Sequence, residues 1–368
     1  MGVLPGAGGA GGGGLAGGGG LAGGADGLPD EAPCEVAPLF VTERGRLGSL
    51  LAGLDVMDWQ LPSPCPGWTV LGLCGHLAGD DLSFLARHRD GYHGTPAPSG
   101  ATEDEFIAWL DGMQDEWVRA ARRLSPAIVA GLLDWAGPQI ASTLRGQDPR
   151  ARTASVSWAA TGPVPVWLDQ IRELSEYWIH RQQLLQALGR PSDLRSDLAG
   201  PVLDGLRWAY PFRLGQAAGS PGRRGAGSPG RQAAESPGRR GAESPGRRGA
   251  GSPGRRGRGE PGDTVTISVS GPVTVTWWLV ASPAGWRFCH EPGPRTVASL
   301  AMTTEQAWRM LTNNLPASER SRITAPAPAP APGTGTGTGT GSGSGSGSGD
   351  AEILDILYQT RAIIGTPK

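Results

Sequence analysis

An eight-residue unit that begins Ser-Pro-Gly repeats five times in tandem from Ser220, and this repeat most limits how the chain can fold. Proline and glycine in every copy exclude a continuous helix or strand ladder, and the unit has no large apolar side chain to bury. We therefore expect 218–262 to be a disordered linker between two folded parts. Its ten arginines leave two interpretations open: a flexible spacer, or an arm that binds phosphates of nucleic acid or anionic lipid.

Two further segments have low complexity. Residues 1–33 are glycine-rich, and 325–349 consist of Ala-Pro, Gly-Thr and Gly-Ser dipeptides. We expect both to be disordered. The remaining residues are numerous enough for hydrophobic cores, and we assign them to two domains, 34–217 and 263–368, the second interrupted by the dipeptide tract.

Composition excludes several classes of protein. Ten of the 33 basic side chains lie in the linker with three of the 34 acidic ones, so the rest of the chain is acidic and no nucleic-acid partner is expected. No apolar run approaches the roughly 20 residues that span a membrane. The glycine-rich start does not read as a secretory signal, and four irregularly spaced cysteines do not form a disulfide framework. We therefore expect a cytoplasmic protein.

The first folded part has the apolar periodicity of helices. A capping box, Thr102 to Glu105, marks one helix start, and Gly189 followed by Pro191 marks a helix end. The pattern predicts helices over 36–54, 69–89, 102–124, 128–144, 167–188 and 198–214. This part is therefore predicted to be a helix bundle.

Beyond the linker the apolar period changes from helical to two, which is typical of strands. The predicted strands are 264–270, 273–280, 285–288 and 297–302, and the predicted helices are 304–311 and 351–364. We expect a small α+β domain, so that the fold class is an α domain followed by an α+β domain.

Three residues form a candidate metal site. Glu176 and His180 are four residues apart on one predicted helix and therefore share a face, while His76 lies within another helix. Two imidazoles and a carboxylate suit Zn²⁺ and leave a fourth position for water or substrate. Asp80, one turn after His76, would orient its imidazole from outside the ligand set. On spacing alone, Glu176 and His180 are equally well explained as a helix-stabilising pair.

Two sequence blocks resemble a known family. Trp59–Val70, with the following Gly75-His-Leu-Ala-Gly79, and Glu176–Gly189 are similar to the signature of the mycothiol-dependent maleylpyruvate isomerase family. The metal-binding domain of that family is a DinB-like four-helix bundle. Thr303–Arg309 and Arg361–Gly365 are more loosely similar to its C-terminal domain.

The resemblance spans roughly 37–215 and 263–365. It implies a Zn²⁺ ion held by His76, Glu176 and His180, with mycothiol as a thiol cosubstrate. The implied activity is cis–trans isomerisation of a maleylpyruvate-like acid, or transfer of the thiol to an electrophile, and the sequence does not separate the two. A protein that binds a metal or small molecule without catalysis is the alternative.

Two further residues have both a functional and an ordinary interpretation. Cys65, in Pro-Cys-Pro-Gly, would be a nucleophile or fourth ligand, or a small side chain packed in a tight turn. Arg309 would bind an anionic substrate or cofactor from the C-terminal domain, or would simply lie on the surface.

Overall fold

The computed structural model describes residues 28–29, 32–96, 98, 102–154, 156–219, 259–320, 323 and 348–362. The three tracts expected to be disordered lie almost entirely outside this described part. The end of the first tract is described and packs on the helical domain: Leu28 is buried, and the carbonyl of Pro29 accepts a hydrogen bond of 3.0 Å from Nε1 of Trp167.

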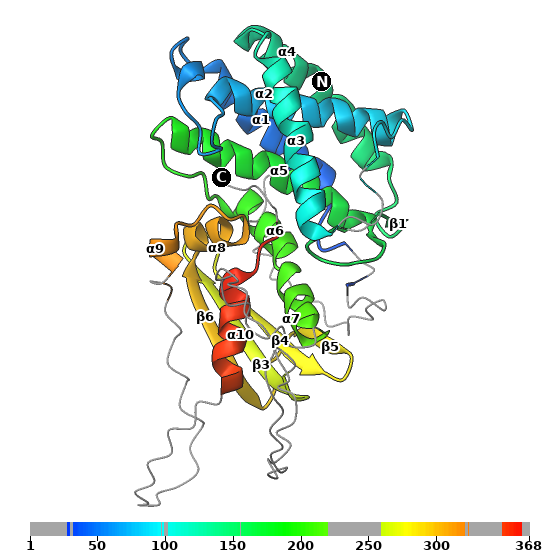
Figure 1. The fold of residues 1–368 in the computed structure, drawn as a ribbon, viewed down its shortest axis with the longest axis vertical. Helices are drawn as coiled ribbons and strands as arrows, with labels where there is room; N and C mark the ends of the chain where they lie inside the picture. Colours follow the sequence, from blue (N-terminus) through cyan, green and yellow to red (C-terminus); the bar gives the residue numbers. More distant parts are fainter. Residues whose placement is uncertain are drawn as a thin grey trace, which may run out of the picture.

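Helices make up most of the described part of 36–219, as the periodicity predicts. The helices are α1 (Val36–Ala52), η1 (Asp58–Gln60), α2 (Val70–Phe84), η2 (Leu85–Arg89), α3 (Glu103–Ala121), α4 (Pro126–Gly146), α5 (Val166–Ala187), α6 (Ser196–Leu206) and α7 (Ala209–Gly219). Two short strands, β1 (Arg152–Thr153) and β2 (Val164–Pro165), pair before α5. Helices α1 and α2 each pack against α4 and α5, which gives the four-helix bundle, and α3 crosses over α2 (Figure 1).

Local sequence fixes where these helices begin. Thr69 caps α2 by accepting a hydrogen bond from the backbone of Gly72, and Thr102 and Glu105 form the capping box of α3. Ser125 caps α4, whose first residue is a proline that needs no backbone donor. Each cap satisfies amide groups that would otherwise be unpaired at a helix start.

The bundle core contains aromatic side chains and buried ion pairs, among them Arg181–Glu43 and Arg44–Asp81. Tyr177 meets Phe40 edge to face with ring centroids 5.2 Å apart, and Trp178 is fully buried behind them on α5. Arg181 donates to both carboxylate oxygens of Glu43 at 2.6 and 2.8 Å. These contacts hold α5 against α1, so the face of α5 that carries the candidate ligands has a fixed orientation.

The single helix predicted over 198–214 is wrong. The chain breaks between α6 and α7 at Arg207 and Trp208. The guanidinium of Arg207 lies 4.7 Å from the ring centroid of Phe288, and Trp208 meets the same ring edge to face. The break therefore allows α7 to turn away from the bundle and pack on the C-terminal sheet.

The C-terminal region is a small α+β unit, as predicted. Its elements are β3 (Asp263–Ser270), β4 (Val275–Ser282), β5 (Gly285–Cys289), β6 (Arg295–Thr303), α8 (Thr304–Leu311), α9 (Ala317–Arg320) and α10 (Ser348–Gln359). The sheet order is β5-β4-β3-β6, with β6 parallel to β3 and the other pairs antiparallel. Helices α7 and α10 lie side by side against this sheet (Figure 1). The exact domain limits, 34–217 and 263–368, stay a prediction.

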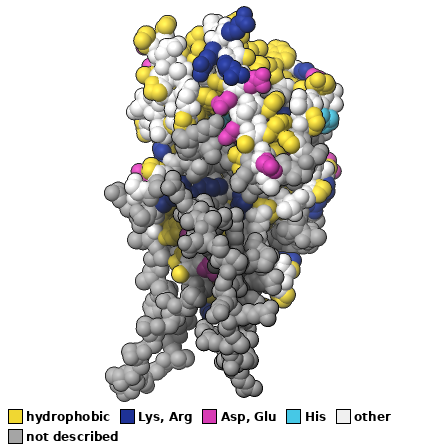
Figure 2. Space-filling model, viewed as in Figure 1, with side chains coloured by type: hydrophobic (Ala, Val, Ile, Leu, Met, Phe, Trp, Pro, Cys, Tyr) yellow, Lys and Arg dark blue, Asp and Glu magenta, His cyan; other side chains and the backbone are white. Residues whose placement is uncertain are grey.

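Among the described residues, no helix is long and apolar enough to cross a membrane. On the face shown in Figure 2, basic and acidic side chains lie interspersed with hydrophobic ones over the helical domain.

Candidate metal centre

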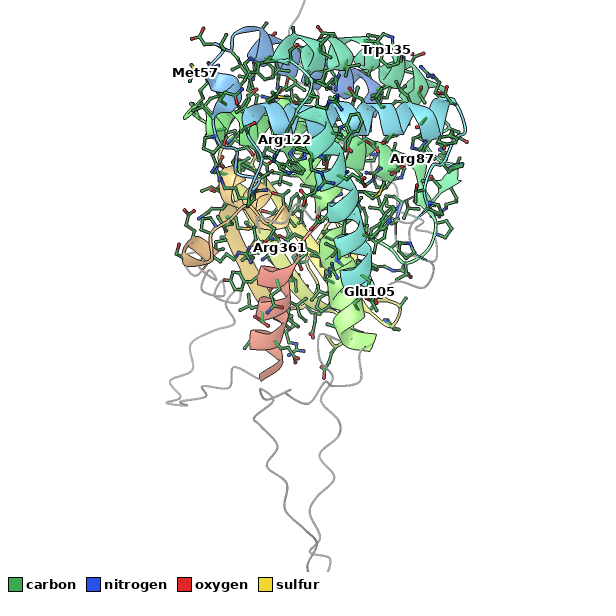
Figure 3. The ribbon with its side chains drawn as sticks, turned by 45° about the horizontal axis from the view of Figure 1, so that its top comes forward. Met57, Arg87, Glu105, Arg122, Trp135 and Arg361 are labelled. Atoms are coloured by element: carbon green, nitrogen blue, oxygen red, sulfur yellow. The ribbon has the colours of Figure 1, made fainter. Side chains whose placement is uncertain are left out.

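His76 lies on α2, and two glycines of this helix allow α3 to pack closely beside it. A Cβ atom on Gly79 would lie 2.2 Å from Nε1 of Trp117, and one on Gly75 would lie 3.1 Å from Cβ of Ala121. The indole Nε1 of Trp117 instead donates to the carbonyl of Gly75 at 2.7 Å. Glu105 and Arg122 mark the two ends of α3 in Figure 3. The small residues around His76 therefore place α3 directly against its imidazole.

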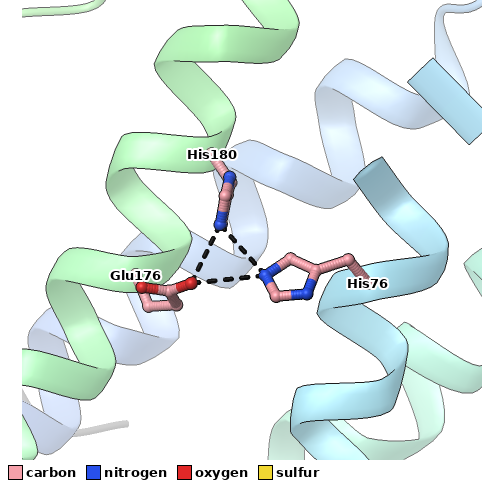
Figure 4. A group of neighbouring side chains, drawn as sticks. All are labelled: His76, Glu176 and His180. Carbon is pink, nitrogen blue, oxygen red and sulfur yellow. Dashed lines mark hydrogen bonds and ion pairs between the residues drawn. The ribbon is translucent and has the colours of Figure 1, made fainter. Parts of the chain in front are cut away.

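Helix α5 supplies the other two side chains of the predicted site. His180 Nε2 lies 2.9 Å from Glu176 Oε1, one helical turn away, and 3.1 Å from His76 Nε2 (Figure 4). The distance from His76 Nε2 to Glu176 Oε1 is 3.3 Å. Both histidines are buried, whereas the side chain of Glu176 is 20% exposed. The structure therefore brings together the three residues singled out from the sequence, and their role as metal ligands stays a prediction.

Both imidazoles are held by glutamine side chains that sequence reasoning missed. His76 Nδ1 lies 2.9 Å from Oε1 of Gln114 on α3, and His180 Nδ1 lies 2.7 Å from Oε1 of Gln183. Since an amide oxygen only accepts, each Nδ1 carries a proton and donates. A neutral imidazole in this tautomer has its lone pair on Nε2, so both lone pairs face Glu176 and each other.

These atoms fit a zinc ion. With Zn–N and Zn–O bonds of about 2.0–2.2 Å, tetrahedral coordination separates two ligand atoms by about 3.3 Å. The three separations in the structure are 2.9, 3.1 and 3.3 Å. The three atoms are thus already spaced as one face of a tetrahedron, and Oδ2 of Asp80 lies beside them, 3.2 Å from His76 Nε2.

Without a metal, the close contacts perturb the two residues on α5 in opposite directions. Burial alone raises the pKa of Glu176, but the charge and hydrogen bonds of His180 and His76 outweigh it and hold the pKa well below its usual range. Burial alone lowers the pKa of His180, yet Glu176 and the neighbouring Cys65 raise it well above its usual range. In the metal-free chain a proton on His180 therefore supplies the positive charge beside the Glu176 carboxylate, and a bound metal ion would have to displace this proton.

Asp80 contacts the site in two ways. Its Oδ1 accepts a hydrogen bond of 3.1 Å from Nε2 of Gln114, the amide that holds His76. Its Oδ2 lies 3.2 Å from His76 Nε2, the nitrogen that faces the other two candidate ligands. Gln114 occupies the Nδ1 position of His76 and is itself held by Asp80, so the role of Asp80 in orienting this imidazole stays a prediction.

Cys65 and Trp68, from the loop before α2, line the same site. The thiol of Cys65 donates to Oε1 of Gln183 at 3.3 Å and influences the pKa of His180. The ring of Trp68 lies 5.1 Å from that of His76. Cys65 is thus partly buried and lies close to His180, one of the candidate metal ligands. It does more than fill the tight turn before α2.

Arg309 lies on α8, where the C-terminal domain meets α5. It donates to Glu305 and, at 3.1 Å, to Oε1 of Gln186, and its guanidinium lies 4.8 Å from the ring centroid of Trp308. These contacts join the two domains. Binding of an anionic ligand by Arg309 stays a prediction.

Comparison with known proteins gives the same family as the sequence blocks. Residues 40–185 match the model of the mycothiol maleylpyruvate isomerase N-terminal domain, a stretch that contains α2, α3 and most of α5. Among curated proteins, none matches the chain.

Two solved structures are similar to this chain. One is a crystal structure of a mycothiol-dependent maleylpyruvate isomerase, 13% identical, which covers 78% of this chain and 90% of its own with a TM-score of 0.41. The other is a histidine-to-alanine mutant of such an isomerase, also 13% identical, which covers 77% and 88% with a TM-score of 0.40. The family model matches residues 40–185, so the similarity to the mycothiol maleylpyruvate isomerase N-terminal domain applies to that stretch of the chain.

Proposed function

We propose that this chain is a Zn²⁺-dependent enzyme that uses a low-molecular-weight thiol such as mycothiol, most directly to isomerise a maleylpyruvate-like cis acid. The observation that carries the proposal is the set of three donor atoms on His76, Glu176 and His180, mutually 2.9–3.3 Å apart. The family match supports the choice of thiol and substrate class.

When bound, zinc supplies a Lewis acid that makes a coordinating thiol ionise at neutral pH. The protein supplies the rest. Gln114 and Gln183 fix both imidazoles in the tautomer that offers Nε2, and the Glu176 carboxylate gives the site a negative charge. The side chains of Glu176 and Asp80 are each 20% exposed, and the thiol and the acid are proposed to enter at this edge of the site.

An isomerase and a transferase differ in what becomes of the thiol. In isomerisation the thiol sulfur adds to the activated double bond, the resulting single bond rotates, and elimination restores the double bond and the free thiol. In transfer the sulfur displaces a leaving group from the electrophile and is consumed. Both reactions need the same site, so the measurement that separates them is the thiol balance.

The test is turnover of maleylpyruvate by the zinc-loaded protein with mycothiol, followed by formation of the trans isomer and by thiol titre. We expect the trans isomer to form with no loss of thiol, and no turnover in His180→Ala. His93→Ala is the matched control, because His93 is exposed in a loop, and it should retain full activity. Loss of thiol in step with an electrophile would make the protein a transferase. Binding of thiol without turnover of either kind would make it a non-catalytic binding protein.

A further inference from the structure

A chain of side-chain amides joins the C-terminal domain to the metal centre. Gln183 on α5 holds His180 Nδ1 with its Oε1 at 2.7 Å, and its Nε2 donates to Oδ1 of Asn314 at 2.9 Å. Asn314 follows α8 in the C-terminal domain. Gln183 is buried, with 4% of its surface exposed, so each of its polar atoms depends on these partners.

The direction of each bond in this chain is determined by Asn314. Its Nδ2 donates to the carbonyl of Thr312 at 2.9 Å and to the Thr312 hydroxyl at 2.8 Å. The Asn314 oxygen must therefore face Gln183, so Gln183 must donate with Nε2 and accept with Oε1. The only donor that His180 then offers to this oxygen is its Nδ1–H, and its Nε2 lone pair faces the candidate ligands.

The end of α8 holds Asn314 in place. Asn313 has the left-handed backbone conformation, with φ of 59°, which asparagine tolerates better than most residues. Its side-chain oxygen accepts from Arg320 at 2.8 Å and from Arg361 at 3.2 Å, and Arg361 lies at the end of α10 that approaches the bundle (Figure 3). The backbone amide of Asn314 donates to the carbonyl of Arg309 at 2.7 Å. The turn is therefore rigid and aims Asn314 at α5.

We infer that Asn314 is a positioning residue that sets the tautomer and orientation of His180 through Gln183, so that the C-terminal domain completes the metal site. This inference rests on the proposed function for its metal. The contacts themselves are properties of the metal-free chain. A metal ligand that loses such a hydrogen-bonded partner typically loses 10- to 100-fold in metal affinity.

The test measures Zn²⁺ affinity by competition with a chromophoric chelator for Asn314→Leu, Gln183→Leu and the double variant. We expect roughly tenfold weaker binding for Asn314→Leu and roughly tenfold to a hundredfold for Gln183→Leu. Because Asn314 acts only through Gln183, the double variant should bind zinc no more weakly than Gln183→Leu alone. Gln359→Leu is the matched control: it is also an amide-to-leucine change in the C-terminal domain, but Gln359 is exposed on α10 and donates to Asp355 of the same helix, so its zinc affinity should equal that of the unmodified protein.

A second measurement needs no metal and shows whether the variants fold. In the metal-free protein, the Nδ1 proton of His180 should give a slowly exchanging NMR signal that is lost in Gln183→Leu and exchanges faster in Asn314→Leu. Failure of the unmodified protein to bind zinc would overturn the proposed function but leave this signal as the test of the amide chain. The inference is overturned if Asn314→Leu keeps both the zinc affinity and the signal, if the two single effects multiply in the double variant, or if Gln359→Leu loses as much zinc affinity as Asn314→Leu.

Discussion

Gly79→Ala should destabilise the protein and weaken the metal centre, although alanine is the better helix former. The added Cβ atom would lie 2.2 Å from Nε1 and 2.4 Å from Cδ1 of Trp117, far inside any real contact. The obstacle is a rigid indole ring, so α3 must move away from α2 by more than an ångström or Trp117 must leave its place. Either movement breaks the hydrogen bond from Trp117 to the carbonyl of Gly75.

The magnitude follows from three contributions. Overpacking of this kind costs about 1–3 kcal/mol, and the lost hydrogen bond costs about 1 kcal/mol. Exchange of glycine for alanine within a helix offsets about 1 kcal/mol. The free energy of unfolding should therefore fall by about 2 kcal/mol. Gln114 lies three residues before Trp117 on α3, so its contact with His76 should loosen as well, and zinc affinity should fall by about tenfold.

The assay is urea unfolding of the metal-free protein together with a zinc titration. Gly112→Ala is the matched control, because it makes the same substitution within α3 at an exposed position where a Cβ atom meets nothing within 4 Å. This control should gain up to about 1 kcal/mol and leave zinc affinity unchanged. If Gly79→Ala is stabilised as much as the control, the glycines do not serve to bring α3 against His76.

Two further predictions concern buried charges. Glu43→Gln should lower the free energy of unfolding by about 2 kcal/mol, because the buried guanidinium of Arg181 loses its bidentate carboxylate and keeps the 2.9 Å contact of Nη1 with Asp193. The double variant Glu43→Leu, Arg181→Leu should recover part of the loss in urea unfolding. A single variant as stable as the unmodified protein would contradict this. Zinc affinity should rise about tenfold per pH unit from about pH 6.5 up to the raised pKa of His180, because zinc must displace one proton from His180, whereas the lowered pKa of Glu176 leaves its carboxyl group already ionised. The free energy of unfolding of the metal-free protein should change in the opposite direction. The proton on His180 contributes fully to this free energy below about pH 6.5, and the contribution is lost as the pH rises through the raised pKa of His180 in the folded state. Urea unfolding measured across the same pH range would show the loss.

The candidate ligands could be predicted from the sequence to different degrees. Glu176 and His180 share one helix face by their spacing alone, and the structure places their side-chain atoms 2.9 Å apart. His76 is 104 residues from His180, and no periodicity reveals which helices pack together. Only the family resemblance of the two blocks linked them, because a resemblance carries tertiary information that one sequence does not.

The amides around the site were missed for a physical reason. Gln114 and Asn314 reach the site from other elements, and glutamine and asparagine occur so often on surfaces that their presence predicts nothing. Gln183 was accessible to reasoning, because it lies three residues after His180 and therefore on the same face of α5. The sequence signal for Gln114 is indirect and lies in the two glycines beside His76, which indicate that another helix comes close.

The break between α6 and α7 shows a second limit. Residues 198–214 keep an apolar helical period, but Gly205 and Pro211 flank the break. Pro211 has no amide proton to donate to the carbonyl of Arg207, four residues before it, so a continuous helix is interrupted there. The sequence therefore signals the break, whereas the packing of Arg207 and Trp208 on Phe288 of the sheet is a tertiary contact that neither segment shows alone.

The measurement that tests the account most directly is the zinc content of the purified protein by elemental analysis, compared with His76→Ala, His180→Ala and the control His93→Ala. Three donor atoms spaced for one ion predict one zinc per chain in the unmodified protein and in the control, and loss of zinc in both site variants. Undiminished zinc in His180→Ala would contradict the account, because the ion would then be held elsewhere.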